Sequence, residues 1–358
     1  MTLKVNEEYL KTDSLFFASL VTPDAIKHAE ENLAPVLREI ARKIIDTPSP
    51  RLYFIGCGAS LSAMMGGKYL LDRFTSIPSY AYSGWQFIHR APRAVTEQAF
   101  VFTTSYSGQT PEVQEAKRFA LERTATTIAI TDNKSTPLAQ DADYVLDYQS
   151  KAVYTAPLAI MYLLAAYLMQ FGNENHKTGN EIIEETHQLP DRLAQLIEES
   201  RQGAGELAEQ FKGEEGFYVL GTGPLYSLAF KLALSVVIEN LWIDGCPIDT
   251  GEFYHGPIEI VPPDQEVSQR MAFMHLVGTD STRTVSKQAI DFCAKHNCRQ
   301  LIFDAKKTPE FGELFSPFAL FVPTEWFILY MSAIKEHDVD ERRYMGKIGS
   351  HWGDYGNL

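Results

Sequence analysis

A segment rich in serine and threonine follows a short apolar run and leads directly into a helical pattern. The apolar run covers residues 99–103, the segment reads Thr-Ser-Tyr-Ser-Gly-Gln-Thr at 104–110, and a helix is expected over 111–123. Thr110 is a favourable N-cap, and the proline after it suits the first helical position. Backbone N–H groups, hydroxyls and the positive end of the helix dipole then converge on one point, and Gly108 lets the backbone approach a ligand closely. The segment predicts a phosphate site; a capped turn without a ligand is the alternative.

A carboxylate and a histidine form a second candidate pair. Glu239 interrupts the apolar helical stretch 232–242, and His255 follows sixteen residues later in Thr-Gly-Glu-Phe-Tyr-His-Gly-Pro, residues 250–257. Taken singly, Glu239 fits a solvent-facing helix position and His255 fits a packed loop histidine. Taken together, they match what sugar-phosphate isomerisation requires: a carboxylate that moves a carbon-bound proton and a histidine that titrates near neutrality and opens the sugar ring.

Neither a dinucleotide cofactor nor a metal ion is expected. The Gly-Cys-Gly sequence at 56–58 follows an apolar run, but Leu61 stands where a dinucleotide-binding motif needs its third glycine, and no acidic residue ends the next run at 76–82. These glycines simply permit a tight strand-to-helix turn. Of the four cysteines only Cys293 and Cys298 are close in sequence, which is a poor zinc pattern and favours reduced thiols.

Charge and hydropathy limit the partners. The formal net charge of -14 disfavours nucleic acid, because surfaces that bind nucleic acid are usually basic. It also repels a phosphorylated substrate at long range, so a phosphate must be held locally by backbone N–H groups and hydroxyls. Residues 1–20 carry charged side chains and lack the apolar core of a signal peptide, and the apolar stretch 152–171 is typical of a buried core helix. We therefore expect a cytoplasmic protein that binds no membrane.

Strands and helices alternate along the chain, which indicates parallel sheets covered by helices. The expected strands are 51–55, 99–103, 126–131, 144–146, 216–220, 273–277 and 300–303, and the expected helices are 23–45, 111–123, 188–209, 226–242 and 282–296. The sequence "YFIGCGAS" at 53–60 is similar to "YVLGTGPL" at 218–225. We interpret this as an internal duplication of a doubly wound α/β unit, with the polar stretch 173–185 at the junction. The predicted domains are 1–180 and 181–358.

Four segments are similar to those of known proteins. "TTSYSGQTPE" at 103–112 resembles the phosphate loop of sugar-isomerase (SIS) domains, whose form is Ser-x-Ser-Gly-x-Thr, and "TDNKSTPLAQDADYVLDY" at 131–148 resembles the segment that follows it. "GEFYHGPIEI" at 251–260 resembles the isomerase part of glucosamine-6-phosphate synthase. "ERRYMGKI" at 341–348 is similar to the ending of the fructosamine-6-phosphate deglycases, which include the fructoselysine-6-phosphate and fructose-asparagine-6-phosphate deglycases. The resemblance covers nearly the whole chain and implies two tandem SIS domains.

The resemblance also implies roles for individual residues. Glu239 matches the catalytic carboxylate, and His255 matches a histidine that in homodimers of this family reaches into the neighbouring subunit's site. Glu252 lies in the same motif and is a further catalytic candidate. The residues that match those holding the sugar phosphate are Ser60, Ser105, Ser107 and Thr110. The second half has "GTDSTR" at 278–283 in place of the phosphate-loop motif, so one phosphate site per chain is expected.

The implied reaction is the hydrolysis of a 6-phosphorylated Amadori compound, a 6-phosphofructosyl amine or amino acid, to glucose 6-phosphate and free amine without a cofactor. An aldose–ketose isomerase or a deaminase of an aminosugar phosphate, using the same residues, is the first alternative. A non-catalytic sugar-phosphate sensor is the second. Tyr106 stands where many relatives have a smaller or polar residue, and the tail continues past Lys347. Both features are expected to shape the side of the pocket that takes the amine.

Overall fold

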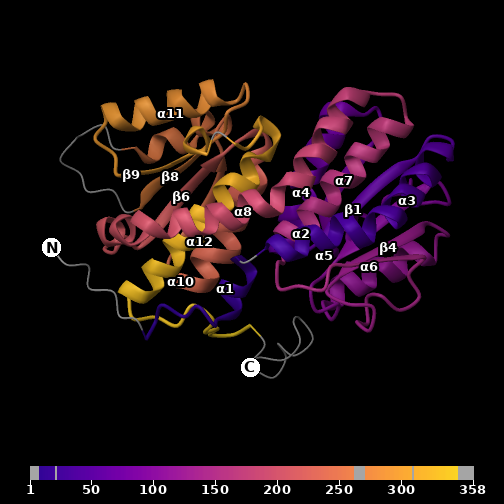
Figure 1. Cartoon of the computed structure of the whole chain (residues 1–358), viewed down its shortest axis with the longest axis horizontal. Coiled ribbons are helices and arrows are strands. Elements are labelled where there is room, and N and C mark those ends of the chain that lie inside the picture. The colour runs from indigo at the N-terminus through magenta and orange to yellow at the C-terminus, as the bar shows by residue number, and fades with distance from the viewer. Residues whose placement is uncertain (1–7, 21, 262–270, 309, 346–358) are drawn as a thin grey trace. The chain divides into compact units, whose positions relative to one another are not determined.

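The computed structural model describes residues 8–20, 22–261, 271–308 and 310–345 of the 358-residue chain (Figure 1). These residues form two compact units: residues 22–191 with 342–345, and the described residues of 192–341 with 8–20. Each unit contains one parallel β-sheet flanked by helices, which confirms the predicted α/β fold. The predicted domain boundary after residue 180 lies in the same helix, α8 (His176–Phe211), as the division between the units. That boundary stays a prediction.

The sheet of the first unit has five parallel strands in the order β2-β1-β3-β4-β5. Successive side chains of a strand point to opposite faces. Tyr53 and Ile55 therefore pack in one cluster with Phe87, whereas the ring of Phe54 lies 5.1 Å from that of Phe102. The strands are β1 (Arg51–Gly56), β2 (Ser79–Ser83), β3 (Ala99–Thr104), β4 (Thr126–Thr131) and β5 (Tyr144–Asp147).

Helices cover the first sheet. The helix α4 contacts β1, β2 and α7, whereas α6 contacts β3, β4 and α5. The apolar helix α7 is buried along almost its whole length, as expected for 152–171. The helical elements of this unit are α2 (Pro23–His28), the π-helix η1 (Ala29–Leu33), α3 (Ala34–Asp46), α4 (Ala59–Phe74), α5 (Gly84–Arg90), α6 (Pro111–Leu121), α7 (Thr155–Phe171) and the first part of α8.

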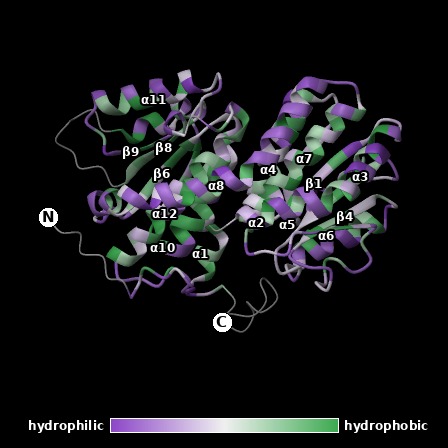
Figure 2. Ribbon diagram, in the orientation of Figure 1, coloured by the Kyte–Doolittle hydropathy of each residue, from purple (hydrophilic) through white to green (hydrophobic). Residues whose placement is uncertain are grey.

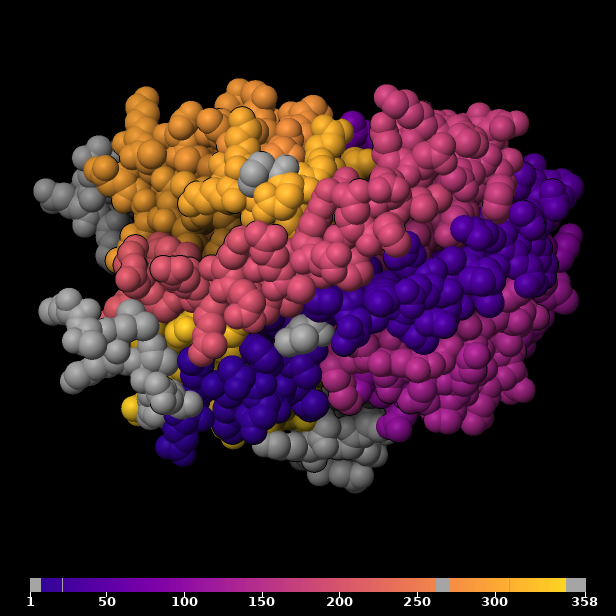
Figure 3. Space-filling view, viewed as in Figure 1, coloured from indigo at the N-terminus to yellow at the C-terminus, as the bar shows by residue number. Residues whose placement is uncertain are grey.

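The sheet of the second unit has four parallel strands in the order β7-β6-β8-β9. This order repeats that of the first four strands of the other sheet, as an internal duplication requires. The strands are β6 (Gly216–Gly221), β7 (Asp244–Asp249), β8 (Ala272–Val277) and β9 (Gln300–Asp304). In Figure 2, β6 and β8 are largely hydrophobic, whereas α11 (Arg283–Lys295) carries many hydrophilic residues. Figure 3 shows α11, in orange, at the molecular surface.

Helical segments surround the second sheet. The long helix α8 is interrupted at Gln202 and Gly203, whose backbone angles are not helical. The predicted helix 226–242 is found as three consecutive segments with a π-helical centre. The elements are α1 (Leu15–Leu20), the 3₁₀-helix η2 (Gly223–Leu225), α9 (Tyr226–Leu232), the π-helix η3 (Ala233–Ile238), α10 (Glu239–Leu241), η4 (Glu252–His255), η5 (Pro257–Ile260), α11, η6 (Ala305–Lys307), η7 (Glu313–Phe315) and α12 (Ser316–Ile334).

Two helical stretches of the described chain are long and apolar enough to cross a membrane. Gly223–Leu241 is two-thirds buried (67%), and Glu313–Ile334 is 89% buried. Core helices of soluble proteins meet the same criteria, so these stretches are weak indicators of a membrane span. Both helices pack within the second unit.

The seven predicted strands are all found, with each end within one residue of the predicted position. Of the two remaining strands, β2 overlaps the run at 76–82, and β7 was not predicted. The β7 strand contains Gly245 and Pro247, two residues of low strand propensity. An edge strand tolerates proline, because one side of the strand needs no hydrogen bonds to a neighbour. Residues 244–249 can therefore form a strand because they lie at the edge of the sheet, a position that local sequence does not reveal.

Candidate active site

The predicted phosphate loop connects the carboxyl end of β3 to the N-terminus of α6. The β3 strand is fully buried, and at its end Ser105 N–H donates to the carbonyl of Ile130 on β4 at 3.1 Å. The chain then turns, with Gly108 N–H donating to Ser105 O at 3.2 Å, and enters α6 with Thr110 at the N-cap and a proline in the first turn. Both helix-start predictions are confirmed. The loop lies at the sheet edge where parallel α/β sheets bind ligands.

Some hydroxyl groups of this loop form hydrogen bonds within the protein, and one is exposed to solvent. Ser105 and Thr110 pair with each other, with their oxygens 2.8 Å apart, and the Thr110 side chain therefore makes no capping bond to α6. Thr104 is buried and donates to the sulfur of Met64 at 3.2 Å, so it is not available to a ligand. Ser107 is exposed, and its oxygen accepts the N–H of Gln109 at 3.2 Å. Ser107 is thus the hydroxyl that faces outward.

A side chain at Gly108 would strain this loop. Its φ of +63° is left-handed, and an added Cβ would lie 2.5 Å from Cβ of Thr136. The amide of Gln114, one turn into α6, donates to the carbonyl of Gly108 at 2.9 Å. The loop is therefore held by a hydrogen bond from α6 and by contact with the loop after β4. Its backbone is fixed before any ligand arrives, which is what an anion site made of N–H groups requires.

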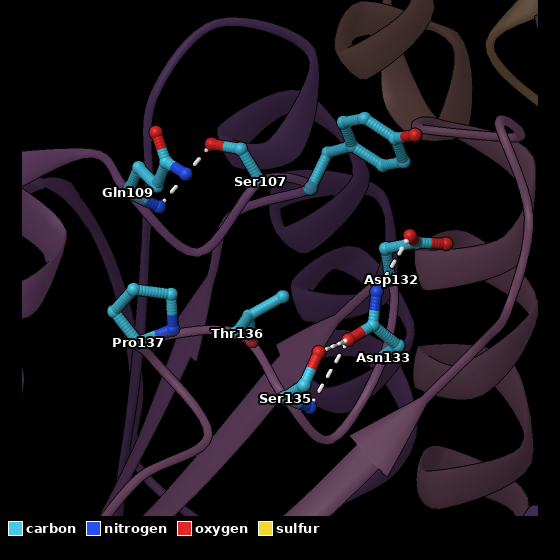
Figure 4. A pocket seen from close by; sticks show the side chains of 8 residues that line it. Ser107, Gln109, Asp132, Asn133, Ser135, Thr136 and Pro137 are labelled. Carbon is cyan, nitrogen blue, oxygen red and sulfur yellow. Dashed lines mark hydrogen bonds between the residues drawn. The ribbon is translucent and has the colours of Figure 1, made fainter.

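A pocket of about 290 Å³ opens beside this loop (Figure 4). Ser107 and Gln109 lie on one side, and Asn133 and Ser135 lie on the other, where the Ser135 hydroxyl donates to Oδ1 of Asn133. The pocket is lined by Tyr106, Ser107, Gln109, Asp132, Asn133, Ser135, Thr136 and Pro137. The residues at 132–137 received no individual role from the sequence, although the segment resembled its SIS counterpart. Adjacent parallel strands β3 and β4 bring the two loops together.

Tyr106 forms one wall of the pocket and is paired with a lysine. The Lys151 ammonium donates to the phenolic oxygen of Tyr106 and lies 4.8 Å from the ring centroid. The hydrogen bond to Tyr106 raises the pKa of Lys151. The carbonyl of Tyr106 accepts the N–H of Asp132 and the hydroxyl of Thr131, both at 3.2 Å. The pair places a positive charge beside Tyr106, in a pocket whose other lining residues are neutral or acidic.

Ser60 lies in the first turn of α4, after the glycine-containing turn at the end of β1. Its side chain is buried, and its N–H donates to Cys57 O at 3.2 Å. An added Cβ at Gly56 would lie 2.9 Å from the backbone nitrogen of Leu61, so the glycine serves a tight strand-to-helix turn, as predicted. Because β1 and β3 are paired strands, Ser60 and the phosphate loop share one edge of the sheet.

A partly buried thiol and a buried carboxylate connect these two turns. Cys57 Sγ lies 3.5 Å from Oε1 of Glu112, in the first turn of α6, and Oε2 of Glu112 is buried without a hydrogen-bond partner among the described residues. Burial raises the pKa of Cys57 to about 12, and the neighbouring Glu112 acts in the same direction. Cys57 is therefore a protonated packing residue. Neither residue was singled out from the sequence.

Glu239 begins the short helix α10 in the second unit, immediately after the π-helix η3. The side chain is half-buried, on a segment that also exposes Leu234 and Ile238. The segment packs against β7, where an added Cβ at Gly245 would lie 2.4 Å from the carbonyl of Ala233. π-Helical turns are rare and concentrate at functional sites. The turn shifts the residues after it to a new face of the helix, which is a placement that the sequence did not predict.

Glu252 and His255 lie on the 3₁₀-helix η4, just beyond the end of β7. Both side chains are exposed, and between them Phe253 is fully buried. The Phe253 ring lies 5.8 Å from that of Phe273 and 6.0 Å from that of Phe292. This aromatic anchor fixes the backbone of the motif while Glu252 and His255 face solvent. His255 is therefore accessible to a second chain.

The described residues contain no group of three or more His, Cys, Asp and Glu side chains arranged to hold a metal ion. The motif "ERRYMGKI" extends to Ile348, and Lys347 with the tail after it lies outside the described residues.

The chain is similar to sugar-phosphate proteins along almost its whole length. An SIS domain is matched over residues 47–171. Fructoselysine 6-phosphate deglycase of Escherichia coli (strain K12) is 32% identical over 336 residues, which cover 92% of this chain and 96% of the relative. Fructosamine deglycase FrlB of Bacillus subtilis (strain 168) is 29% identical, covering 87% and 95%. A Bacillus subtilis structure assigned as a candidate phosphosugar isomerase superposes with a TM-score of 0.79 at 27% identity, covering 90% of this chain and 98% of that one.

Proposed function

Because this chain belongs to the SIS-domain family of sugar-phosphate enzymes, we propose that it hydrolyses a 6-phosphorylated Amadori compound to glucose 6-phosphate and a free amine or amino acid. The observation that carries the proposal is the braced loop at 105–110, with its exposed serine and its pocket of about 290 Å³ at the N-terminus of α6. A helix N-terminus and fixed N–H groups favour a phosphate monoester. The name of the 32% identical relative supports a fructosamine-type substrate.

The phosphate is held by neutral groups. Ser107, together with the paired hydroxyls of Ser105 and Thr110 and with Ser60 at the neighbouring strand end, surrounds the phosphate. The N–H groups of the first turn of α6 supply the charge complementarity. Neutral donors permit both capture and release, which a phosphorylated product requires. The anchored phosphate fixes one end of the open sugar chain.

Glu239 transfers a proton between C1 and C2 of the substrate. Its carboxylate takes a proton from C1 of the open-chain ketoamine and returns a proton to C2. The C2 oxygen gains a proton and the nitrogen loses one, so that the C2 ketone becomes a hydroxyl and the C1–N bond becomes an imine. Water then adds to the imine carbon and the amine leaves, which gives the aldehyde of glucose 6-phosphate. His255, contributed by the partner of a homodimer, opens the sugar ring by transferring protons between the ring oxygen and the C2 hydroxyl. Glu252, on the same short helix, is a further acid–base candidate.

No organic cofactor or metal is required by these steps, since they consist of proton transfers and the hydrolysis of an imine. We place the reaction in the cytoplasm, and nucleic acid and membranes have no part in it. The pocket wall made by Tyr106, with Lys151 bonded to its phenolic oxygen, is the side at which the amine portion is recognised. This ammonium favours an amine component that carries a carboxylate, as amino acids do.

Product analysis tests the proposal. The enzyme is incubated with a panel of 6-phosphofructosyl amino acids and hexosamine 6-phosphates, and products are identified by mass spectrometry. We expect release of amine and glucose 6-phosphate from the first group. In deuterated water, deuterium is expected at C2 of glucose 6-phosphate, reduced by any internal return of the C1 proton. Isomerisation or deamination of a hexosamine phosphate, with no Amadori phosphate cleaved, establishes the alternative activity. Binding without turnover of any compound establishes a sensor.

A further inference from the structure

The second sheet carries a loop equivalent to the phosphate loop of the first. In the first sheet Thr103 pairs with Ile55, and in the second His275 pairs with Leu220. Each partner is the residue before the glycine that ends its strand, Gly56 in β1 and Gly221 in β6. The pairs therefore mark the same place in the two halves of the duplication.

Counting on from these pairs aligns the two loops without a gap. Eight residues after Thr103 the helix α6 begins, and eight residues after His275 the helix α11 begins. The N-cap is a threonine in both, Thr110 and Thr282. Gly108 stands five residues after Thr103 in the first loop, and Asp280 stands five residues after His275 in the second. The position that lacks a side chain in the phosphate loop thus carries a carboxylate in the second loop.

The Asp280 carboxylate lies inside its loop. The side chain is only 4% exposed, and Oδ1 accepts the N–H of Thr282, at the N-cap of α11, at 2.6 Å. The other oxygen, Oδ2, is buried and has no hydrogen-bond partner in the described part of the chain. An added Cβ at Gly278 would lie 2.8 Å from Oδ2, so the carboxylate is in contact with the start of the loop as well as its end.

The nearby cation does not explain this burial. The Arg283 guanidinium is committed to Asp304, with two bonds of 2.7 Å, and to the carbonyl of Gly278 at 2.9 Å. Burying a carboxylate is costly unless it is compensated. The compensation comes from backbone N–H and from the positive end of α11, a helix of thirteen residues. This is the chemistry of an anion site, with the anion supplied by the chain.

We propose that the Asp280 carboxylate fills an anion-binding loop in the second unit, in the place that the substrate phosphate takes in the first unit. The loop admits inorganic phosphate or a phosphate monoester once this side chain is removed. Asp280 thereby keeps each chain to one phosphate site and keeps sugar phosphates away from the second sheet. The inference uses the proposed phosphate loop for comparison, but the second site is tested independently of it.

The test counts phosphate sites. Inorganic phosphate is titrated by equilibrium dialysis into the native protein, Asp280→Gly, and the double variant Asp280→Gly/Ser107→Ala. The variant Asp280→Gly restores the residue type of the first loop. We expect one site per chain in the native protein and two in Asp280→Gly. The second site keeps its affinity in the double variant, whereas the first is weakened.

A matched control distinguishes the effect of opening the loop from the effect of removing one negative charge. Asp249 also ends a strand of this sheet, and its Oδ1 accepts the N–H of Gly251 at 2.8 Å. It is followed only by the four-residue 3₁₀-helix η4, so Asp249→Gly changes the net charge equally without opening a helix N-terminus. If Asp280→Gly has no more sites than the native protein, or if Asp249→Gly gains an equal additional site, the inference is overturned. No site in the native protein with one site in Asp280→Gly supports the inference and counts against the proposed function alone.

Amide variants give a second measurement that does not need the glycine variants to fold. Asp280→Asn keeps the shape of the side chain and removes its charge. If the carboxylate is the internal anion of α11, the melting temperature falls further in Asp280→Asn than in Asp249→Asn. An equal or smaller fall in Asp280→Asn overturns the inference.

Discussion

The hydroxyl groups of Ser105 and Thr110, at the two ends of the phosphate loop, lie 2.8 Å apart and hydrogen-bond to each other. One hydroxyl hydrogen is used in this bond, so the pair keeps one for a ligand. The bond closes the loop over the start of α6, and it leaves Ser107 as the exposed hydroxyl of the motif. The contributions of these residues to binding are therefore unequal.

Ser107→Ala is expected to weaken binding of glucose 6-phosphate about 2- to 13-fold, because one neutral hydrogen bond contributes about 0.5–1.5 kcal/mol. Isothermal titration calorimetry measures the affinity. Ser135→Ala is the matched control, since Ser135 lines the same pocket but its hydroxyl is already bonded to Asn133. Equal losses in the two variants would mean that the phosphate does not sit on Ser107.

Gly108→Ala is expected to distort the loop and lower the free energy of unfolding by about 1–3 kcal/mol, the usual range for a strained backbone position. The reasons are the φ of +63° and the 2.5 Å approach of the new Cβ to Thr136. Chemical denaturation gives the stability and calorimetry the phosphate affinity, which is expected to fall as well. Gly213→Ala is the control, because nothing lies within 4 Å of its added Cβ. A stable Gly108→Ala with native affinity contradicts the role given to this loop.

Glu239→Gln is expected to lower turnover at least about 100-fold, the lower end of what acid–base catalysis contributes. The amide keeps the size of the side chain but cannot act as a base, so sugar-phosphate binding should persist. Steady-state kinetics and calorimetry measure the two properties. Glu259→Gln, which changes an exposed glutamate on η5, is the control and should retain activity. Full amine release by Glu239→Gln rules out the proposed mechanism.

His255 and Glu239 are expected to act in one site built from two chains. Inactive Glu239→Gln and inactive His255→Ala are mixed under conditions that exchange subunits, and activity is followed over time. One of the two sites in a heterodimer then carries both native residues, so part of the activity returns. Native mass spectrometry confirms that heterodimers have formed. Heterodimers without activity argue that each chain supplies its own histidine.

Lys231 and Glu325 form a buried ion pair between α9 and α12, with Nζ and Oε1 2.7 Å apart and both side chains almost fully buried. Lys231→Met is expected to lower the free energy of unfolding by about 3–5 kcal/mol, because it leaves a buried carboxylate uncompensated. Burial already raises the pKa of Glu325. The double variant Lys231→Met/Glu325→Leu should recover much of this loss. Urea unfolding followed by circular dichroism measures both.

The exposed pair of Lys27 and Glu31, with charged atoms 3.9 Å apart, provides the control for this experiment. Lys27→Met is expected to change the free energy of unfolding by less than about 1 kcal/mol, since solvent screens an exposed pair. If the buried and exposed variants lose similar stability, or if the double variant is as unstable as Lys231→Met, burial of the pair is not what makes it important.

Local sequence was enough to predict the seven strands and the strand–turn–helix units. An apolar run forms a buried strand, a glycine permits the turn, and Thr110 with the proline after it starts a helix, so each feature depends on residues close together in the chain. The repeated strand pattern also predicted the duplication, with which the matching strand orders agree. The residue types and spacing of Glu239 and His255 were likewise sufficient to suggest proton-transfer chemistry.

How these pieces meet depends on tertiary packing. The 132–137 segment lines the pocket because β4 is the neighbour of β3 in the sheet, a relation between residues distant in sequence. The polar stretch 173–185 is helical from His176, because packing of one apolar face can stabilise a helix whose overall composition is polar. Burial of Asp280 likewise depends on the fold, since the carboxylate is compensated there by a backbone N–H and by the end of a helix.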